Sequence, residues 1–391
     1  MKNKLNIGVI TSSRADFYLL EKIIDRLKKK SNIKLIISGS HFSKKYGFSY
    51  KHLFNLKKCK KIKVKLNIDD TSKKNITINS SKIIKECSEI FHIENLDSLI
   101  VLGDRYEILS FVYSALIFNI PIIHIHGGEV THGSIDDQIR HSISKMSNFH
   151  FTSHKEYKSR LIQMGENKIN IFNYGSPGIE NALKTKIISK KDIEKKFKIN
   201  FSNKNLLVTY HPETSSKSDV HSDFETILQA CEYFKDINFI FTYPNFDNKS
   251  DSIINLLNNF KKRNKNFFII RNFGQEAYFS VIKIVDAVMG NSSSGIIEVP
   301  IFKKPTINLG IRQSGRVKSN SILDCKIDKK RIINKIKLMF SEKFLKSIKY
   351  NDYSKLNTSK NISNKILKLN LNNAYPKKFV DINRILLERK S

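Results

Sequence analysis

The chain has 391 residues, more than one typical core contains, so two domains are expected. Its hydrophobic fraction of 40% excludes disorder over most of the length, and no stretch approaches the ~20 apolar residues of a membrane span. The net charge of +33 comes from lysines spread along the whole chain, and basic runs such as 57–61 have few aromatic neighbours. This pattern indicates a solvated surface that attracts anionic metabolites, not a nucleic-acid-binding protein.

The first half of the chain alternates the patterns of buried strands and amphipathic helices. Strands are predicted at 5–11, 33–38, 96–102, 120–125, 149–152 and 169–173. Helices are predicted at 16–30, 78–93, 106–118 and 136–147, with a polar, irregular stretch from 39 to 77. Repeated β–α units with apolar strands predict a parallel sheet that is covered on both faces.

The pattern restarts after Gly175-Ser176-Pro177-Gly178, which suits a hinge. Strands are predicted at 206–209, 237–242, 267–270, 287–289 and 306–308. Helices are predicted at 222–234, 249–262, 277–284 and 295–302. The Lys/Asn-rich stretch 326–373 is predicted to be helical on the outside, and 379–388 to be a terminal helix. We therefore expect two similar α/β halves with a cleft between them.

Charged groups and glycines follow two of the apolar strands in the first half. Gly103-Asp104-Arg105 ends one run, and His124-Ile125-His126-Gly127-Gly128-Glu129 ends the next. Ligands of parallel sheets bind beyond the carboxyl ends of the strands, so these groups should meet in one cleft. Together with Asp136 and Arg140 they suit proton transfer on an anionic ligand. Zinc would need two ligands in addition to the two histidines of the HxH motif. One aspartate of the pair Asp136 and Asp137 could instead stabilise the start of a helix, where the backbone dipole favours a carboxylate.

Three further segments carry anion-binding residue types. Arg14 lies at a helix start and can add a bidentate contact to an anion, or be a surface charge beside a capping Asp16. A helix is expected to begin at Asn291-Ser292-Ser293-Ser294-Gly295, and this segment can cradle a phosphate or be a serine-rich helix cap. Glu298, one turn later, can bind the diol of a ribose. His211 ends a strand, where it can contact phosphate, transfer protons or be structural.

At these residues the chain resembles the UDP-N-acetylglucosamine 2-epimerase family, from Ser13-Arg14-Ala15-Asp16 to the segment 308–316 that contains Arg312. The 124–129 motif, with Gly133 and Asp136-Asp137 after it, resembles the hydrolysing branch. The resemblance implies an α/β fold of two Rossmann-like domains in a GT-B-like arrangement, with the active site in the interdomain cleft. The implied domains are 1–176 for the sugar and catalytic carboxylates and 177–372 for the nucleotide, with a C-terminal helix at 373–391 packing back on the first domain.

The resemblance also implies a reaction and its residues. UDP leaves by anti elimination across C1–C2 of the sugar, and water then adds to give the free 2-epimerised sugar, N-acetylmannosamine. Asp104, Asp136 and His211 match catalytic positions. The implied substrate contacts are Arg14, Arg105, Arg140, Asn245, Ser292, Ser293, Glu298 and Arg312.

One position departs from the family pattern. Many members carry a catalytic glutamate where this chain has His126. Either His126 takes the proton-transfer role or Glu129 supplies the carboxylate. An imidazole titrates near pH 6.5 and a glutamate near ~4.3, so a histidine in this role would move the pH optimum upward.

Other readings stay open at this point. Within the family, the substrate could be a UDP- or GDP-2,4-diacetamido-2,4,6-trideoxyhexose, with selectivity expected around 40–50 and 129–134. A GT-B glycosyltransferase would need an acceptor, and a nucleotide-sugar-binding regulator would not need the acidic groups to converge. No residue pattern requires a metal or another cofactor. The resemblance implies a UDP-sugar as substrate, no nucleic-acid or membrane partner, a cytoplasmic location and a homodimer or homotetramer.

Overall fold

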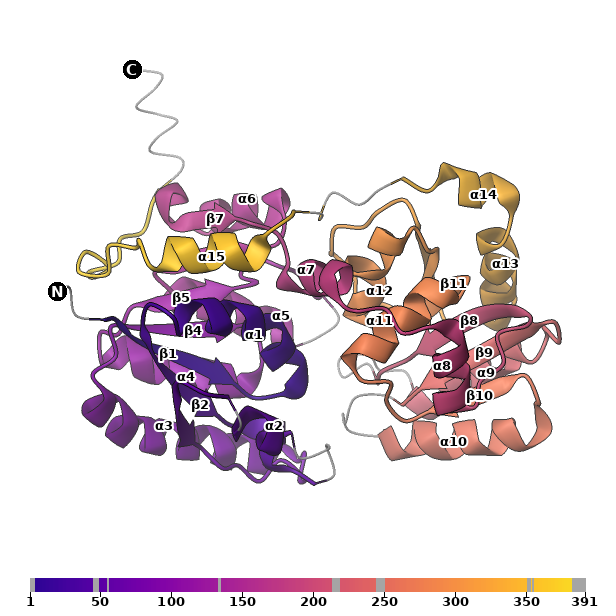
Figure 1. The fold of residues 1–391 in the computed structure, drawn as a ribbon, viewed down its shortest axis with the longest axis horizontal. Helices are drawn as coiled ribbons and strands as arrows, with labels where there is room; N and C mark the ends of the chain where they lie inside the picture. Colours follow the sequence, from indigo (N-terminus) through magenta and orange to yellow (C-terminus); the bar gives the residue numbers. More distant parts are fainter. Residues whose placement is uncertain are drawn as a thin grey trace, which may run out of the picture. The chain divides into compact units, whose positions relative to one another are not determined.

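The computed structural model describes residues 4–44, 49–54, 56–132, 135–212, 219–243, 250–349, 353 and 355–381. The chain divides into two compact units. The first comprises Met1–Glu129, Asp136–Glu180 and Lys355–Ser391, and the second comprises Val130–Ile135 and Asn181–Ser354. Each unit contains one wholly parallel sheet packed with helices (Figure 1), which confirms the predicted α/β class with two Rossmann-like domains. The cleft expected between them stays a prediction.

The first unit has a seven-stranded sheet in the order β3-β2-β1-β4-β5-β6-β7. Its strands are β1 (Asn6–Thr11), β2 (Asn32–Ile37), β3 (Cys59–Lys63), β4 (Ser98–Leu102), β5 (Ile122–Ile125), β6 (Phe149–Thr152) and β7 (Ile171–Asn173). Its helices are α1 (Arg14–Leu27), η1 (Gly39–Phe42), α2 (Tyr50–Phe54), α3 (Lys73–Glu94), α4 (Tyr106–Ile117), α5 (Asp136–Met146), α6 (Lys155–Gln163), η2 (Lys168–Asn170) and α15 (Thr358–Ile366). Helix α7 (Pro177–Lys184) contains the point where the chain passes from this unit to the second.

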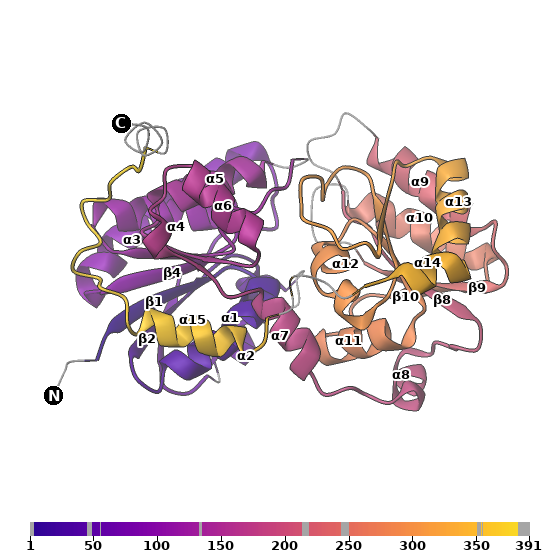
Figure 2. The same ribbon diagram turned by 90° about the horizontal axis from the view of Figure 1, so that it is seen from above.

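Apolar strands explain why helices cover both faces of this sheet. Every residue of β4 is buried, and no alternation of polar positions interrupts it. One face packs against α1 and α15, and the other packs against α3, α4 and α5. Figures 1 and 2 both show α15, in yellow, lying against the first unit beside α1.

Two segments differ from the sequence-based expectation. Residues 358–366 were expected on the outside, but Ile362 and Ile366 of α15 are buried in the first unit's core. The stretch 39–77, expected to be irregular, contains strand β3, which pairs with β2 at the edge of the sheet, while Lys57, Lys58 and Lys60 are exposed as expected. An edge strand tolerates lysines because one side of it faces water.

The second unit has a six-stranded parallel sheet in the order β10-β9-β8-β11-β12-β13. Its strands are β8 (Lys204–Thr209), β9 (Ile237–Thr242), β10 (Phe267–Ile270), β11 (Ala287–Gly290), β12 (Thr306–Leu309) and β13 (Ile322–Cys325). Its helices are α8 (Lys190–Phe197), α9 (Val220–Cys231), α10 (Ser250–Arg263), α11 (Gln275–Ile284), α12 (Ser293–Ile297), η3 (Val299–Phe302), α13 (Lys329–Met339) and α14 (Glu342–Ser347). Helix α13 buries Ile332, Ile336 and Met339 in the core, so this part of 326–373 also has an inward face.

Both sheets reverse their strand order at one place, between β1 and β4 in the first unit and between β8 and β11 in the second. At such a switch point the loops after the two strands diverge and leave room for a ligand. The sequence-predicted site residues follow these strands, or the strands next to them.

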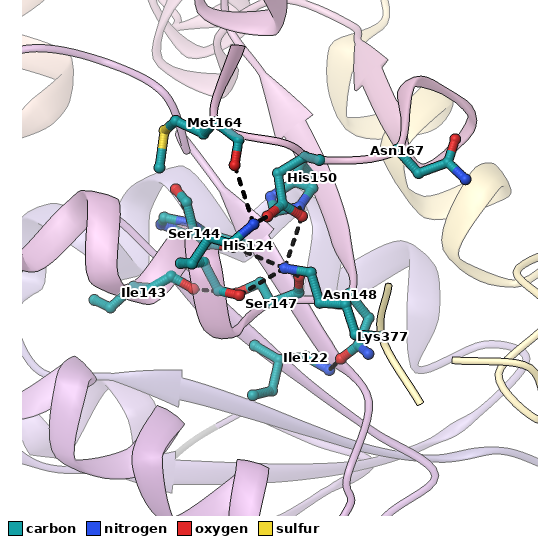
Figure 3. Close-up of polar contacts among 12 residues, drawn as sticks. Ile122, His124, Ile143, Ser144, Ser147, Asn148, His150, Met164, Asn167 and Lys377 are labelled. Carbon is teal, nitrogen blue, oxygen red and sulfur yellow. Dashed lines mark hydrogen bonds and ion pairs between the residues drawn. The ribbon is translucent and has the colours of Figure 1, made fainter. Parts of the chain in front are cut away.

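The segment after α15 returns to the first unit. Tyr375 donates from its hydroxyl to the carbonyl of Ile120 at 3.2 Å, and Asn148 donates to the carbonyl of Ala374 at 2.8 Å. The ammonium of Lys377, which is labelled in Figure 3, pairs with the buried carboxylate of Glu166 at 2.7 Å. Residues 373–381 are not helical, and residues 382–391 of the predicted terminal helix lie outside the described residues. The described part of this segment is therefore held along the first unit by polar contacts.

Within the described ranges, every helix is too short or too polar to cross a lipid bilayer.

Candidate active site

The turn from β1 to α1 is organised by the carboxylate of Asp16. Asp16 accepts the backbone N–H groups of Ser12 and Ser13, both at 2.9 Å, and the hydroxyl of Thr11. Ser13 in turn caps the helix by accepting the backbone N–H of Asp16. Burial raises the pKa of the Asp16 carboxyl, against the opposing effect of these hydrogen bonds. The capping role weighed for Asp16 in the sequence is therefore present, and it fixes the first turn, where Arg14 begins the helix.

Arg14 and Arg105 lie close to a common neighbour, His41. The Nε2 atom of His41 lies 2.8 Å from the Thr11 hydroxyl, and burial lowers the pKa of this imidazole to about 3. The positive charges of Arg105 and Arg14 lower it further. Arg105 is half-exposed and forms a bidentate ion pair with the buried Glu107. Two guanidinium groups therefore stand at the switch point of the first sheet, a suitable place for an anion.

Asp104 and Arg140 form an ion pair that links β4 to α5. Asp104 accepts from Nη2 of Arg140, whose side chain is only 3% exposed. The other terminal nitrogen of Arg140 donates to the carbonyl of Glu129 at 3.1 Å and lies 3.6 Å from Asp137. Arg140, expected as a substrate contact, therefore holds Asp104 and the loop after β5 in place.

The two histidines of the HxH motif have different surroundings. Both ring nitrogens of His124 are paired, Nε2 with the carbonyl of Gly103 at 2.8 Å and Nδ1 with the Ser144 hydroxyl at 3.1 Å. Burial lowers the pKa of His124 to about 3, so it stays neutral. His126, in contrast, uses Nδ1 for an ion-pair contact of 2.7 Å with Glu129. Both ring nitrogens of His124 are thus used inside the protein, whereas Nε2 of His126 has no hydrogen-bond partner among the residues that the structure describes.

Asp136 and Asp137 occupy the first turn of α5, where the helix dipole favours carboxylates. Both are half-buried, and Asp137 also lies 3.8 Å from the Nε2 atom of His141. Asp136 is thus placed on the same helix as Arg140, four residues before it. In the part of the chain that the structure describes, no group of three or more metal-ligating side chains has a geometry suited to a metal ion.

In the second unit, the site is built around His211 and Asn291. The side chain of Asn291 accepts the backbone N–H of His211 at 2.7 Å and donates to its carbonyl at 2.8 Å. Gly290 makes this possible, because a Cβ there would lie 1.8 Å from the Thr209 carbonyl oxygen. Burial and the charge of Arg312 lower the pKa of the His211 imidazole well below its usual value.

The carbonyl of Asn291 anchors the loop that carries Arg312. It accepts from Nη1 of Arg312 at 3.1 Å and from the Gln313 amide at 3.0 Å. Arg312 therefore lies beside both switch-point loops of the second sheet, the one after β8 and the one after β11. This position suits a contact with a phosphate group.

Helix α12 begins directly after Asn291. Ser292 caps it by accepting the backbone N–H of Ser294, so the serine-rich cap considered in the sequence is present. Ser293 and Glu298 are half-buried at the start and end of this helix. Beside it, burial raises the pKa of the Tyr278 hydroxyl to about 12, although the nearby Ser294 side chain opposes that rise. Asn245, the remaining predicted contact, lies outside the described residues.

Sequence reasoning missed several side chains at these strand ends. Ser153, Glu107, Gln313 and Tyr278 each contact a predicted site residue or its loop. Ser153 directly follows β6, so the rule that placed Asp104 at a strand end would also have found it.

Two Rossmann-like units with arginines, carboxylates and imidazoles at their switch points are typical of an α/β enzyme acting on an anionic metabolite. The model of the UDP-N-acetylglucosamine 2-epimerase family matches residues 25–367, and the chain belongs to this family. The family assignment made from the sequence motifs is confirmed.

Curated relatives place the chain in the hydrolysing branch. It is 37% identical over 330 residues to a GDP/UDP-N,N'-diacetylbacillosamine 2-epimerase (hydrolyzing) of Campylobacter jejuni, covering 83% of this chain and 85% of that protein. It is 38% identical over 340 residues to the polysialic acid biosynthesis protein P7 of Escherichia coli, covering 86% of each. A crystal structure of the UDP-GlcNAc 2-epimerase of Neisseria meningitidis has the same fold, with a TM-score of 0.77 at 18% identity over 93% of this chain and 100% of that one.

Proposed function

We propose that this chain hydrolyses UDP-N-acetylglucosamine with inversion at C2, giving UDP and free N-acetylmannosamine. The observation that carries the proposal is the grouping after β4 and β5. There the Asp104–Arg140 pair and the His126–Glu129 pair are joined through the Glu129 carbonyl. This grouping supplies carboxylate and imidazole groups for removing and returning a proton.

The first half of the proposed reaction is an elimination. A base takes the proton from C2 of the sugar, the C–H electron pair forms the C1–C2 double bond, and the C1–O bond to UDP breaks. Asp104, Asp136 and one of the pair His126 and Glu129 are the proposed proton-transfer groups of the first unit. Positioned acids and bases typically accelerate such a step about 10²–10⁴-fold.

The leaving diphosphate needs positive charge and hydrogen-bond donors, because its negative charge grows as the C1–O bond breaks. We assign this role to Arg14 and Arg105 in the first unit and to His211 and Arg312 in the second. Ser292, Ser293 and Glu298, with Asn245, are proposed to bind the remaining phosphate and ribose groups. Water then adds its oxygen to C1 and a proton to C2, on the face that inverts this carbon.

A second substrate has specific support. The Campylobacter jejuni relative is named for N,N'-diacetylbacillosamine, and its identity to this chain is similar to that of the Escherichia coli polysialic acid protein. This sugar carries a second acetamido group and no 6-hydroxyl. The segments expected to select between these sugars, 40–50 and 129–134, are described only in part.

NMR of the purified protein with UDP-N-acetylglucosamine in D₂O tests the proposal. We expect N-acetylmannosamine with deuterium at C2, released in step with UDP. If only the UDP- or GDP-linked diacetamido sugar turns over, the N-acetylglucosamine assignment is wrong and the second substrate is right. Transfer of the sugar to an added acceptor without epimerisation would instead indicate a glycosyltransferase.

A further inference from the structure

We infer that His126 is the residue that takes the C2 proton, and that Glu129 and Ser153 are positioning residues that orient its ring. This inference rests on the proposed function and decides between the two candidates that the sequence left open. It assigns the reacting atom to Nε2 of His126. The carboxylate of Glu129 then serves the histidine and does not contact the substrate carbon.

Hydrogen bonding fixes which ring nitrogen carries the hydrogen. Nδ1 of His126 lies 2.7 Å from Oε1 of Glu129, and the Ser153 hydroxyl donates to the same oxygen at 2.7 Å. With Glu129 ionised, its carboxylate only accepts hydrogen bonds, and Nδ1 of His126 is then the donor. Nε2 of the neutral ring therefore carries a lone pair, the form that a general base needs.

The Nε2 atom is in an unusual position for a buried nitrogen. His126 is 7% exposed, and Nε2 has no hydrogen-bond partner among the residues that the structure describes. Leaving a buried polar atom without a hydrogen-bond partner is unfavourable. A partner supplied by the substrate would remove that cost. His124, two residues earlier, shows the alternative, because both of its nitrogens are paired inside the protein.

The backbone also departs from its preferred conformation here. His126 has a φ of +68°, in the left-handed region that non-glycine residues seldom occupy. Such strain persists where the surrounding structure enforces it, and it concentrates at functional sites. The conformation turns the chain directly after β5, and Glu129, three residues later, lies within hydrogen-bonding distance of Nδ1 of His126.

Neighbouring elements hold the loop in this conformation. Arg160 of α6 donates to the Gly128 carbonyl at 2.6 Å, and Arg140 of α5 donates to the Glu129 carbonyl at 3.1 Å. A Cβ at Gly128 would lie 2.5 Å from the Tyr157 carbonyl oxygen, so this position requires glycine. Among the described residues, the charged and titratable groups on this loop and on the elements packed against it include Glu129, Arg140, Arg160 and the neutral His124 on β5.

In this arrangement the proton balance is complete. The C2–H bond breaks, an Nε2–H bond forms, and the electron pair released becomes the C1–C2 double bond as UDP departs. The Glu129 carboxylate, held by Ser153, stabilises the positive imidazolium that results. The imidazolium then loses its proton to water before the next turnover.

The first test measures kcat, KM and the pH profile of UDP release for three variants. Glu129→Gln should lower kcat about 100-fold or more with KM within about threefold, and should move the acid limb of kcat to lower pH. Glu129→Asp should restore part of the rate, and Ser153→Ala should lower kcat about three- to tenfold. The exposed Glu156→Gln is the matched control. A Glu129→Gln variant with wild-type rate and pH profile would overturn the inference, as would a His126→Gln variant that keeps the acid limb.

A second test does not depend on turnover. Nitrogen-15 NMR of the protein labelled in histidine reports which ring nitrogen of His126 carries the hydrogen, with His126→Gln used for assignment. We expect the Nδ1–H form in the wild type and its loss in Glu129→Gln. An Nε2–H form in the wild type contradicts the inference. A wild type with the expected ring form that converts no nucleotide sugar would contradict the proposed function alone.

Discussion

The amide side chain of Asn291 makes two hydrogen bonds with the backbone of His211 across the switch point of the second sheet. It accepts from the His211 N–H and donates to the His211 carbonyl. The pair closes the gap between the loops after β8 and β11. The Asn291 carbonyl also holds Arg312. Asn291 thus holds the backbone of His211 through its amide side chain and Arg312 through its backbone carbonyl.

Replacing Asn291 with alanine should therefore loosen the loop that carries His211, while the backbone carbonyl that accepts from Arg312 stays in the variant. The backbone N–H and carbonyl of His211 would lose buried partners, which we expect to lower the free energy of unfolding by about 1–3 kcal/mol. UDP affinity should fall as well. Urea unfolding and calorimetric titration with UDP measure the two effects. Unchanged stability and UDP affinity would show that the pair is dispensable.

Asp104 and Arg312 should give opposite kinetic patterns. Asp104→Asn should lower kcat about 10²–10⁴-fold with little change in UDP affinity, because it removes a proton-transfer group. Arg312→Ala should weaken UDP binding first, because it removes positive charge. Turnover assays and UDP titration of both variants check this. The reverse pattern would exchange the two roles.

Acid should destabilise the protein through its buried histidines. His41 and His124 have pKa values of about 3 in the folded protein, against ~6.5 in an unfolded chain. Their contribution to stability is fully present above about pH 6.5 and is lost as the pH falls towards 3. Each should lower the free energy of unfolding by about 1.4 kcal/mol per pH unit in that window.

Unfolding free energies measured between pH 4 and 7 test this slope. His124→Gln should make this slope smaller by about 1.4 kcal/mol per pH unit, because one group fewer takes up a proton on unfolding. The exposed His221→Gln is the control and should leave the slope unchanged. Equal slopes for wild type and His124→Gln would mean that His124 is protonated in the folded protein.

Lys377 should anchor the C-terminal segment. Its ammonium pairs with Glu166 and donates to the carbonyls of Lys145 and Ser147, both at 2.6 Å, at the end of α5. Lys377→Met should therefore increase hydrogen–deuterium exchange in 374–381 and lower the melting temperature. Lys378→Met, on the exposed neighbour, should do neither. Protection equal to wild type in Lys377→Met would show that the other contacts suffice.

Strand and helix patterns predicted most of both sheets, because buried parallel strands are apolar throughout and stand out in the sequence. Strand β3 was missed for the converse reason. Three of its five residues are lysines, and an edge position does not require an apolar sequence. The burial of α15 was missed because its partners in the core of the first unit lie more than 300 residues earlier in the chain.

The candidate site was predictable to the extent that its residues follow strands. Asp104 and His126 were found in this way. The pairing of Arg140 with Asp104 could not be predicted, because it depends on where α5 packs, 36 residues away along the chain. Ser153 and His41 belong to no recognisable motif, and only their contacts show what they do.

The first unit is discontinuous in the sequence, so the order of translation affects how it folds. Its core includes Ile362, Ile366 and Ala374, yet the whole second unit is translated before them. On the ribosome, the second unit can therefore complete its core before the first, although the first begins to emerge earlier. The nascent sheet of the first unit has an uncovered apolar face beside α1 until residues 355–381 arrive, and during that interval it is a natural substrate for chaperones.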